Sequence, residues 1–354
     1  MLLFSFSNKT IATEEKSSST GDSILYSSEV HFKNVRQLTF AADNAEAYFS
    51  FDGKKITFQS NNKAWTMGCD QIFTMPINKF DARQKMPQMI STSEGRTTCS
   101  YFMPDNKHIL FASTHLGNKA CPTEAPRVKG GPYLWNVYDT YDIFVSDLKG
   151  NIVKQLTNSA GYDAEATISP KGDKIVFTST RSGDLELWTM NIDGSNQKQI
   201  TSGLGYDGGA FFSPDGQKLV FRSSRPTTPD EIKEYKDYLA KGLVAPVRME
   251  IYTCNVDGSD LKQITHLGSA NWAPFYHPSG NKIIFSSNHA GSHGFQFNLY
   301  MINIDGTGIE KISADKAFDA FPMFSPDGKK IIFSSNRNNK GTRDTNLFIA
   351  DWVE

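Results

Sequence analysis

The chain has 354 residues, with 37 basic and 38 acidic side chains, so its charge is nearly balanced. Balanced charge argues against a nucleic acid or an anionic membrane as the main partner. Its apolar runs fall short of the ~20 residues that a membrane-spanning helix requires, and we therefore expect no membrane span.

The first segment, MLLFSFSNKTIATEEKSSST, starts apolar and continues rich in Ser and Thr. It lacks the basic region of a signal peptide, and its apolar run is short for one. We expect residues 1–28 to be a disordered leader or the remnant of a signal peptide, and residues 29–354 to form a single folded domain.

A short unit then recurs six times along the chain. Its clearest copy is FSPDGKKIIF, in which an apolar strand end is followed by a turn and a second, β-branched strand. Pro suits the second position of such a turn, and Gly suits its left-handed position. The residues at the Pro position are Phe51, Pro104, Pro170, Pro214, Pro278 and Pro326.

Each unit contains two further strands, which gives four strands per repeat, named A to D in chain order. The units span about residues 40–94, 95–160, 161–204, 205–268, 269–316 and 317–354. The last unit stops after strand C, whereas residues 35–39 (VRQLT) match strand D of the other units. Borrowing that strand pairs the open edges of the first and last units. The sequence therefore predicts an all-β, six-bladed β-propeller of four-stranded blades, in which residues 29–39 complete the last blade.

The segments FSPDGKKIIFSSNR, NIDGSNQKQIT and YDAEATISPKGDKIVFTSTR resemble the TolB-like propeller family, whose repeat is related to the WD repeat. The resemblance covers about residues 30–354. It implies a periplasmic or extracellular protein. It leaves function open, because such propellers serve as binding platforms, as enzyme subdomains and as metal-dependent lyases.

Strands alternate in direction, so the B–C and D–A loops share one face of the propeller, here called the top face. Two B–C loops on this face are enlarged, at about residues 114–140 and 225–248. The second contains a predicted helix, with Thr228 as its cap, Pro229 at its first position and Glu231 completing a capping box. We expect both insertions to wall a pocket or partner site over the channel. The alternative is that they are surface loops without a function, because long loops cost little stability.

The start of strand A lies at the channel mouth. Seven residues before the Pro position, the six units carry Asn44, Thr97, Asp163, Asp207, Asn271 and Asp319; five residues before it they carry Glu46, Cys99, Glu165, Gly209, Ala273 and Phe321. Two interpretations stay open for the Asp residues. They form an acidic ring that holds a cation or a cationic side chain, or they cap turns and bind nearby backbone N–H groups.

The candidate ligand-binding residues all belong to the top face: Asp163, Glu165, Asp207, Asp319, Arg96, Glu46, His115, His289, His293 and Arg337. The three His residues raise the question of a metal, but their spacing matches no known ligand motif, and ordinary loop residues are the alternative. We predict no cofactor, with a divalent cation left open. A disulfide among the top-face cysteines is also expected, and Cys99–Cys121 is the favoured pair, with Cys69 as the third candidate.

The chain has no G-x-S-x-G, no H-E-x-x-H, no P-loop and no dinucleotide fingerprint. The sequence therefore favours a non-enzymatic propeller of the bacterial envelope that binds a protein or a glycan on its top face. One alternative is a hydrolase or lyase that uses channel-mouth carboxylates or His residues with a divalent metal. Another is a structural subunit of a larger envelope assembly.

Overall fold

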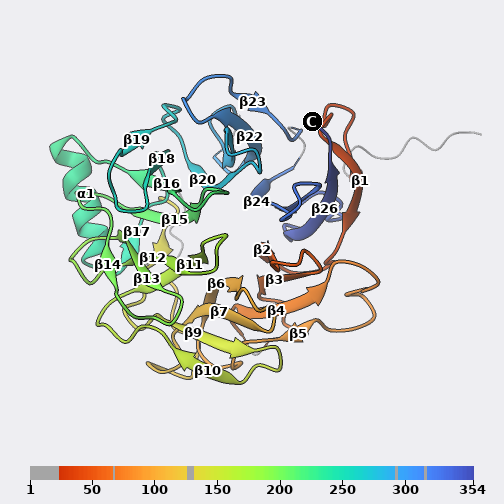
Figure 1. Cartoon of the computed structure of the whole chain (residues 1–354), viewed down its shortest axis with the longest axis horizontal. Helices are drawn as coiled ribbons and strands as arrows, with labels where there is room; N and C mark the ends of the chain where they lie inside the picture. The colour runs from red at the N-terminus through yellow and green to blue at the C-terminus, as the bar shows by residue number, and fades with distance from the viewer. Residues whose placement is uncertain (1–23, 67, 126–130, 292–293, 315–316) are drawn as a thin grey trace, which may run out of the picture.

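The computed structural model describes residues 24–66, 68–125, 131–291, 294–314 and 317–354. Six four-stranded antiparallel sheets stand in a ring around a central channel, as Figure 1 shows, so the predicted six-bladed propeller is confirmed. The leader expected at residues 1–28 falls mostly outside the described residues.

Each blade runs from strand A at the channel to strand D at the rim. Blades 1 and 2 consist of β2 (Asn44–Phe49), β3 (Lys55–Ser60), β4 (Gln71–Pro76) and β5 (Gln88–Met89), then β6 (Thr97–Phe102), β7 (His108–Ser113), β9 (Asp142–Asp147) and β10 (Ile152–Gln155). Blades 3 and 4 consist of β11 (Asp163–Ile168), β12 (Lys174–Ser179), β13 (Glu186–Asn191) and β14 (Lys198–Gln199), then β15 (Asp207–Phe212), β16 (Lys218–Ser224), β18 (Met249–Asn255) and β19 (Lys262–Gln263). Blade 5 consists of β20 (Asn271–Tyr276), β21 (Lys282–Ser287), β22 (Asn298–Asn303) and β23 (Glu310–Lys311).

Blade 6 is assembled from both ends of the described chain. Its strands are β24 (Asp319–Phe324), β25 (Lys330–Ser335), β26 (Asn346–Trp352) and, as strand D, β1 (Phe32–Gln37). In Figure 1 the red β1 lies beside the blue β26. Phe32, Val35 and Leu38 of the N-terminal segment are buried against the blade, which makes this segment the closure of the ring.

Strand B of every blade is packed between neighbouring blades and is accordingly rich in apolar residues. The seventh residue after the Pro position is a fully buried Phe in all six blades: Phe58, Phe111, Phe177, Phe221, Phe285 and Phe333. Large aromatic side chains contribute most of the burial in such cores. The repeated Phe thus explains why six units of limited sequence similarity pack alike.

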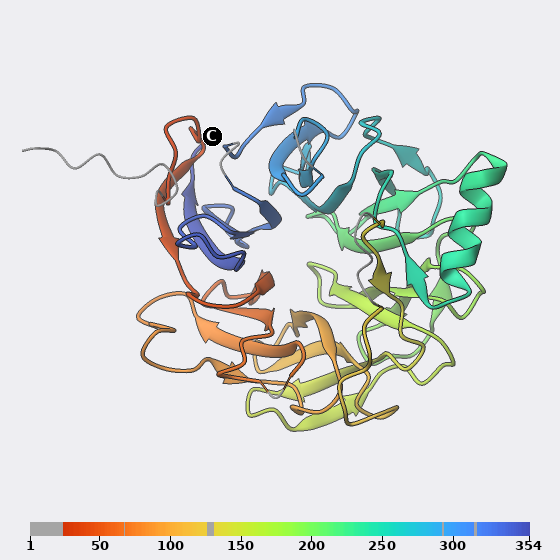
Figure 2. The same cartoon turned by 180° about the vertical axis from the view of Figure 1, so that it is seen from behind.

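The two insertions meet over the top face. β8 (Trp135–Asn136) from blade 2 pairs antiparallel with β17 (Leu243–Val244) from blade 4. The blade 4 insertion also contains α1 (Pro229–Leu239), with Thr228 as N-cap and the predicted capping box, so that prediction is confirmed. Figure 2 shows α1 at the outer rim of the ring. Within the described residues, no helix is both long and apolar enough to span a membrane.

Candidate functional site

A β-bulge interrupts strand A in every blade, at the same distance from the Pro position. The pairing with strand B shifts register there, and the bulged residue has a left-handed φ between +46° and +60°. A bulge of this kind re-aims a side chain. The six bulge residues, here called the bulge ring, are Glu46, Cys99, Glu165, Gly209, Ala273 and Phe321.

All six residues of the bulge ring line one cavity of about 400 Å³. Its roof comes from the two insertions, through residues 133–138 of blade 2 and Val244 of blade 4. Its walls include eight Tyr and Trp residues: Tyr48, Tyr133, Trp135, Tyr138, Tyr141, Tyr162, Tyr206 and Trp272. A cavity of this size that combines aromatic walls with converging polar and charged groups suits a small ligand or part of a larger one.

Glu165 is the most heavily bonded member of the bulge ring. One carboxylate oxygen, Oε1, contacts Arg222 and accepts the Tyr206 hydroxyl at 2.6 Å, and the other, Oε2, accepts from Thr178 and from the backbone N–H of Gly209, both at 2.8 Å. Burial alone would raise the pKa of Glu165, but Arg222 and the two hydroxyls outweigh it and lower that pKa. Glu165 is therefore an ionised and fully bonded carboxylate.

Two glycines in blade 4 leave space for the contact between Glu165 of blade 3 and Arg222 of blade 4. A Cβ atom on Gly209 would collide with the guanidinium of Arg222, and one on Gly208 would collide with the carboxylate of Glu165. The guanidinium of Arg222 also lies over the rings of Trp135 and Tyr206, at 5.1 and 5.0 Å from their centroids. The cavity thus already contains one cation held by a carboxylate and two aromatic faces.

Glu46, at the equivalent bulge of blade 1, differs sharply. Its Oε2 is buried without a hydrogen-bond partner among the described residues. Burial raises the pKa of Glu46 to about 7; a hydrogen bond from the Cys99 thiol lowers it, and the nearby Glu165 raises it further. Burial likewise raises the pKa of Cys99, so this free cysteine is a protonated thiol at neutral pH.

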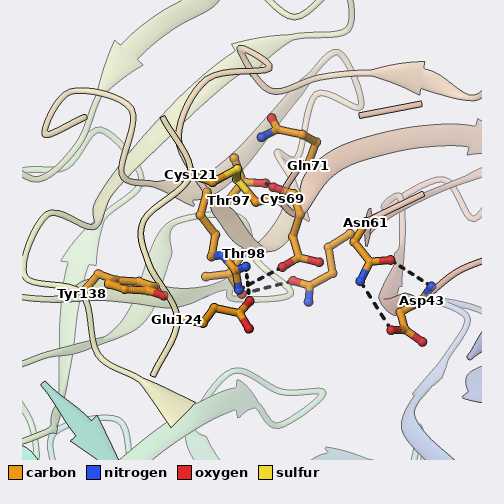
Figure 3. A network of polar contacts seen from close by, with 12 residues as sticks. Asp43, Asn61, Cys69, Gln71, Thr97, Thr98, Cys121, Glu124 and Tyr138 are labelled. Atoms are coloured by element: carbon orange, nitrogen blue, oxygen red, sulfur yellow. Dashed lines mark hydrogen bonds and ion pairs between the residues drawn. A yellow bond between two sulfur atoms is a disulfide. The ribbon is translucent and has the colours of Figure 1, made fainter. Parts of the chain in front are cut away.

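A polar network holds the edge of the roof to blade 1. Arg96 contacts Asp70 at 3.3 Å and also pairs with Glu124 of the insertion. The insertion is further tied down by a disulfide between Cys69 and Cys121, so the expected Cys99–Cys121 pair is wrong. Figure 3 shows the disulfide and the polar contacts of this rim. The error arose because the bulge turns Cys99 into the cavity, beside Glu46.

The structure places the three predicted Asp residues away from the cavity lining, in buried ion pairs. Each pairs with the Arg that lies 18 residues later, at the end of strand B in its own blade. The distances are 2.6 Å for Asp163–Arg181, 2.7 Å for Asp207–Arg225 and 3.0 Å for Asp319–Arg337. Arg337 also pairs with Glu29 at 2.9 Å, and all three side chains of that cluster are fully buried. These pairs tie strands together and, in blade 6, hold the N-terminal segment.

Two of the predicted histidines, His115 and His289, also lie outside the cavity lining. His115 contacts the hydroxyl of Ser113 at 2.8 Å, and His289 contacts that of Ser287 at 2.9 Å. Burial lowers the pKa of both His side chains, which favours neutral rings packed in their own blades. His293 lies outside the described residues. Across the part of the chain that the structure describes, no three His, Cys, Asp or Glu side chains gather as metal ligands.

Of the predicted residues, the structure thus brings Glu46, Glu165 and Arg96 together in the cavity. The predicted site residues did not include Arg222 or Tyr206, whereas Trp135 lies in the insertion that was expected to wall the pocket. A signal for Arg222 was present, because it is a charged residue directly after the apolar run LVF, in the same blade as the glycine pair Gly208–Gly209.

The fold and the cavity define a six-bladed propeller with a roofed site over its channel. The model of the TolB beta propeller domain matches residues 143–236 and 246–342, which is more than half of the chain. The chain belongs to this family.

Solved structures agree on the fold. A TolB candidate from Agrobacterium tumefaciens aligns over 88% of this chain and 91% of its own, with a TM-score of 0.55 and 18% identity. TolB from Acinetobacter baumannii aligns over 89% of this chain and 64% of its own, with a TM-score of 0.52 and 18% identity. An oligogalacturonate lyase from Vibrio parahaemolyticus aligns over 90% and 93%, with a TM-score of 0.51 and 14% identity. At these identities the likeness concerns the fold.

Proposed function

We propose that this chain is a binding propeller that holds part of a protein or glycan ligand in the roofed cavity, without chemical turnover. The observation that carries the proposal is the roof. Two insertions that are far apart in the sequence pair as strands and cover a cavity of about 400 Å³ above the bulge ring. Long loops gain such a paired, aromatic-lined arrangement when they serve a binding site.

The bonding of the carboxylates supports binding rather than catalysis. General acid–base catalysis uses a positioned side chain that is free to exchange a proton with the substrate. Glu165 uses both of its oxygens on Arg222, Tyr206, Thr178 and Gly209. Glu46 is then left as a single available carboxyl in the bulge ring.

The disulfide of this chain supports a location in an oxidising compartment. Disulfides persist in the periplasm and outside the cell and are rare in reducing compartments. The Cys69–Cys121 bridge anchors the roof of the proposed site. Together with membership of the TolB propeller family, it supports a place in the bacterial envelope.

A cavity-filling substitution tests the proposal. Ala273 lines the cavity with φ +47°, and blade 6 carries Phe321 at the equivalent bulge with φ +55°. Ala273→Phe therefore fills the cavity with a side chain that the same backbone already accepts. We expect the wild type to retain ligands from a bacterial glycan array or a random-peptide library, and Ala273→Phe to lose them.

The matched control is Ala240→Phe, the same change at an exposed position at the end of α1. This variant should bind as the wild type does. Equal retention of the same ligands by Ala273→Phe, with an unchanged melting temperature, would show that binding does not use the cavity.

A further inference from the structure

The lining of the cavity carries more negative than positive charge. It contains five acidic and two basic residues: Asp43, Glu46, Asp70, Glu124 and Glu165 against Arg96 and Arg222. Arg96 pairs with both Asp70 and Glu124, which leaves one net negative charge at that rim, and Arg222 neutralises Glu165. Asp43 is exposed at the edge and accepts a hydrogen bond from Asn61. Glu46 differs from these four carboxylates because, within the described chain, it has no ion pair and one of its buried oxygens has no partner.

The repeat symmetry of the propeller shows what is missing beside Glu46. Glu165 of blade 3 receives its cation from blade 4, where Arg222 stands in register with Gly208 of strand A. In blade 2, the neighbour of Glu46, the position in register with Thr98 is Ala112. A methyl group thus stands where the equivalent corner has a guanidinium. Blades 1 and 3 thus share the carboxylate at the bulge, Glu46 and Glu165, but only Glu165 has an Arg from the next blade beside it.

The walls around this corner suit a cation. Aromatic faces attract ammonium and guanidinium groups, most strongly where water is excluded. Tyr48 is close enough to Glu46 for the charge of that carboxylate to raise the pKa of the Tyr48 hydroxyl, after the larger effect of burial. Tyr48, Tyr141 and Tyr162 line the same cavity. Arg222, seated on Trp135 and Tyr206, shows how the cavity holds a cation.

We propose that the cavity binds its ligand through a cationic nitrogen, an ammonium or guanidinium group, seated against Glu46. This inference rests on the proposed function and names the chemistry of its ligand. An uncompensated carboxylate in a partly desolvated, net negative cavity favours a charge-assisted hydrogen bond from a ligand donor. Lysine or arginine side chains and amino sugars share this chemistry.

The test is a titration followed by tryptophan fluorescence, since Trp135 and Trp272 both line the cavity. The cationic probes are N-acetyl-lysine amide, N-acetyl-arginine amide and glucosamine. The neutral counterparts are N-acetyl-norleucine amide and N-acetylglucosamine. We expect saturable binding of at least one cationic probe and much weaker binding of its neutral counterpart. Binding of the amino acid amides or of glucosamine then indicates a protein or a glycan source.

The decisive variant is Glu46→Gln, which keeps the shape of the side chain and removes its charge. It should raise the Kd of a cationic probe by about tenfold or more, the value expected for losing a hydrogen bond to a charged group. The control is Glu94→Gln, which lies outside the cavity lining and whose carboxylate pairs with Lys119 at 3.0 Å, and it should leave the Kd nearly unchanged.

The outcomes separate this inference from the proposed function. If no cationic probe binds saturably, if neutral counterparts bind equally well, or if Glu46→Gln leaves the Kd unchanged, the cationic ligand is refuted. If neutral ligands bind and Ala273→Phe abolishes their binding, the cavity is still a binding site. If Ala273→Phe leaves the binding of every ligand intact, the proposed function falls as well.

Discussion

Replacing Glu46 by Gln should stabilise the protein, and the gain should grow with pH. Burial raises the pKa of this carboxyl from 4.5 to about 7 in the folded chain. Well below pH 4.5 the group is protonated in both states and costs nothing. As the pH rises towards 7, the unfolded chain loses the proton while the folded chain retains it, so the stability of the folded state falls. The cost is roughly 1 kcal/mol at pH 5 and roughly 3 kcal/mol at pH 8.

The measurement is thermal unfolding of both proteins at pH 5 and pH 8. A chain of this size gains about 4 °C in melting temperature for about 3 kcal/mol. Glu46→Gln should therefore melt about 4 °C above the wild type at pH 8 and within about 1 °C of it at pH 5. A difference that is the same at both pH values would refute the reasoning about the burial of Glu46.

Three further predictions concern the elements that hold the site. Deleting residues 1–40 should cost about 5–9 kcal/mol, since three apolar side chains lose their burial, and calorimetry should show it; deleting residues 1–20 should have little effect. Replacing Cys69 and Cys121 by Ser should cost up to about 4 kcal/mol, because the bridge spans 52 residues, and a reductant should lower the melting temperature of the wild type only. Replacing Tyr235 and Leu239 by Ser should release α1 and speed proteolysis between residues 226 and 247, whereas an unchanged digestion pattern would show that its packed face is dispensable.

The fold could be predicted because the repeat carries it. The turn at the Pro position and the Phe seven residues later define strands A and B in each blade. Both recur at the same spacing in the sequence. The closure was equally visible, since residues 35–39 repeat the pattern of strand D. These patterns are local and recur six times, so contacts with distant residues rarely change the secondary structure that they predict.

The site could be predicted only in part, and a bulge explains why. The polar residues at the start of strand A were expected to face the channel mouth, yet Asp163 and Asp207 are buried with Arg181 and Arg225. The left-handed residue two positions later turns its own side chain into the cavity instead. Register at a bulge depends on the pairing of both strands. The sequence of strand A alone therefore does not show whether its first residue or the bulge residue two positions later faces the cavity.

One signal in the sequence did distinguish the two positions. Wherever strand A starts with Asp, in blades 3, 4 and 6, the residue 18 positions later is Arg; the other blades combine Asn with Asn, Thr with His and Asn with His. Such matched pairs indicate contacts within a blade rather than a shared ring. The pairing of β8 with β17 had no comparable signal, because two-residue strands in long insertions carry almost no pattern.

The division between the two positions also explains how one scaffold can serve a particular ligand. The Asp–Arg pairs and the buried Phe residues maintain the blades, so the bulge ring is free to vary without loss of the fold. Here that ring is polar across blades 1 to 3, with Glu46, Cys99 and Glu165, and small or apolar across blades 4 to 6, with Gly209, Ala273 and Phe321. A ligand that matches both halves carries its charge towards blade 1 and an apolar surface towards blades 5 and 6. Because Arg222 already pairs with Glu165, Glu46 is the carboxylate of the bulge ring that can accept the charge of the ligand.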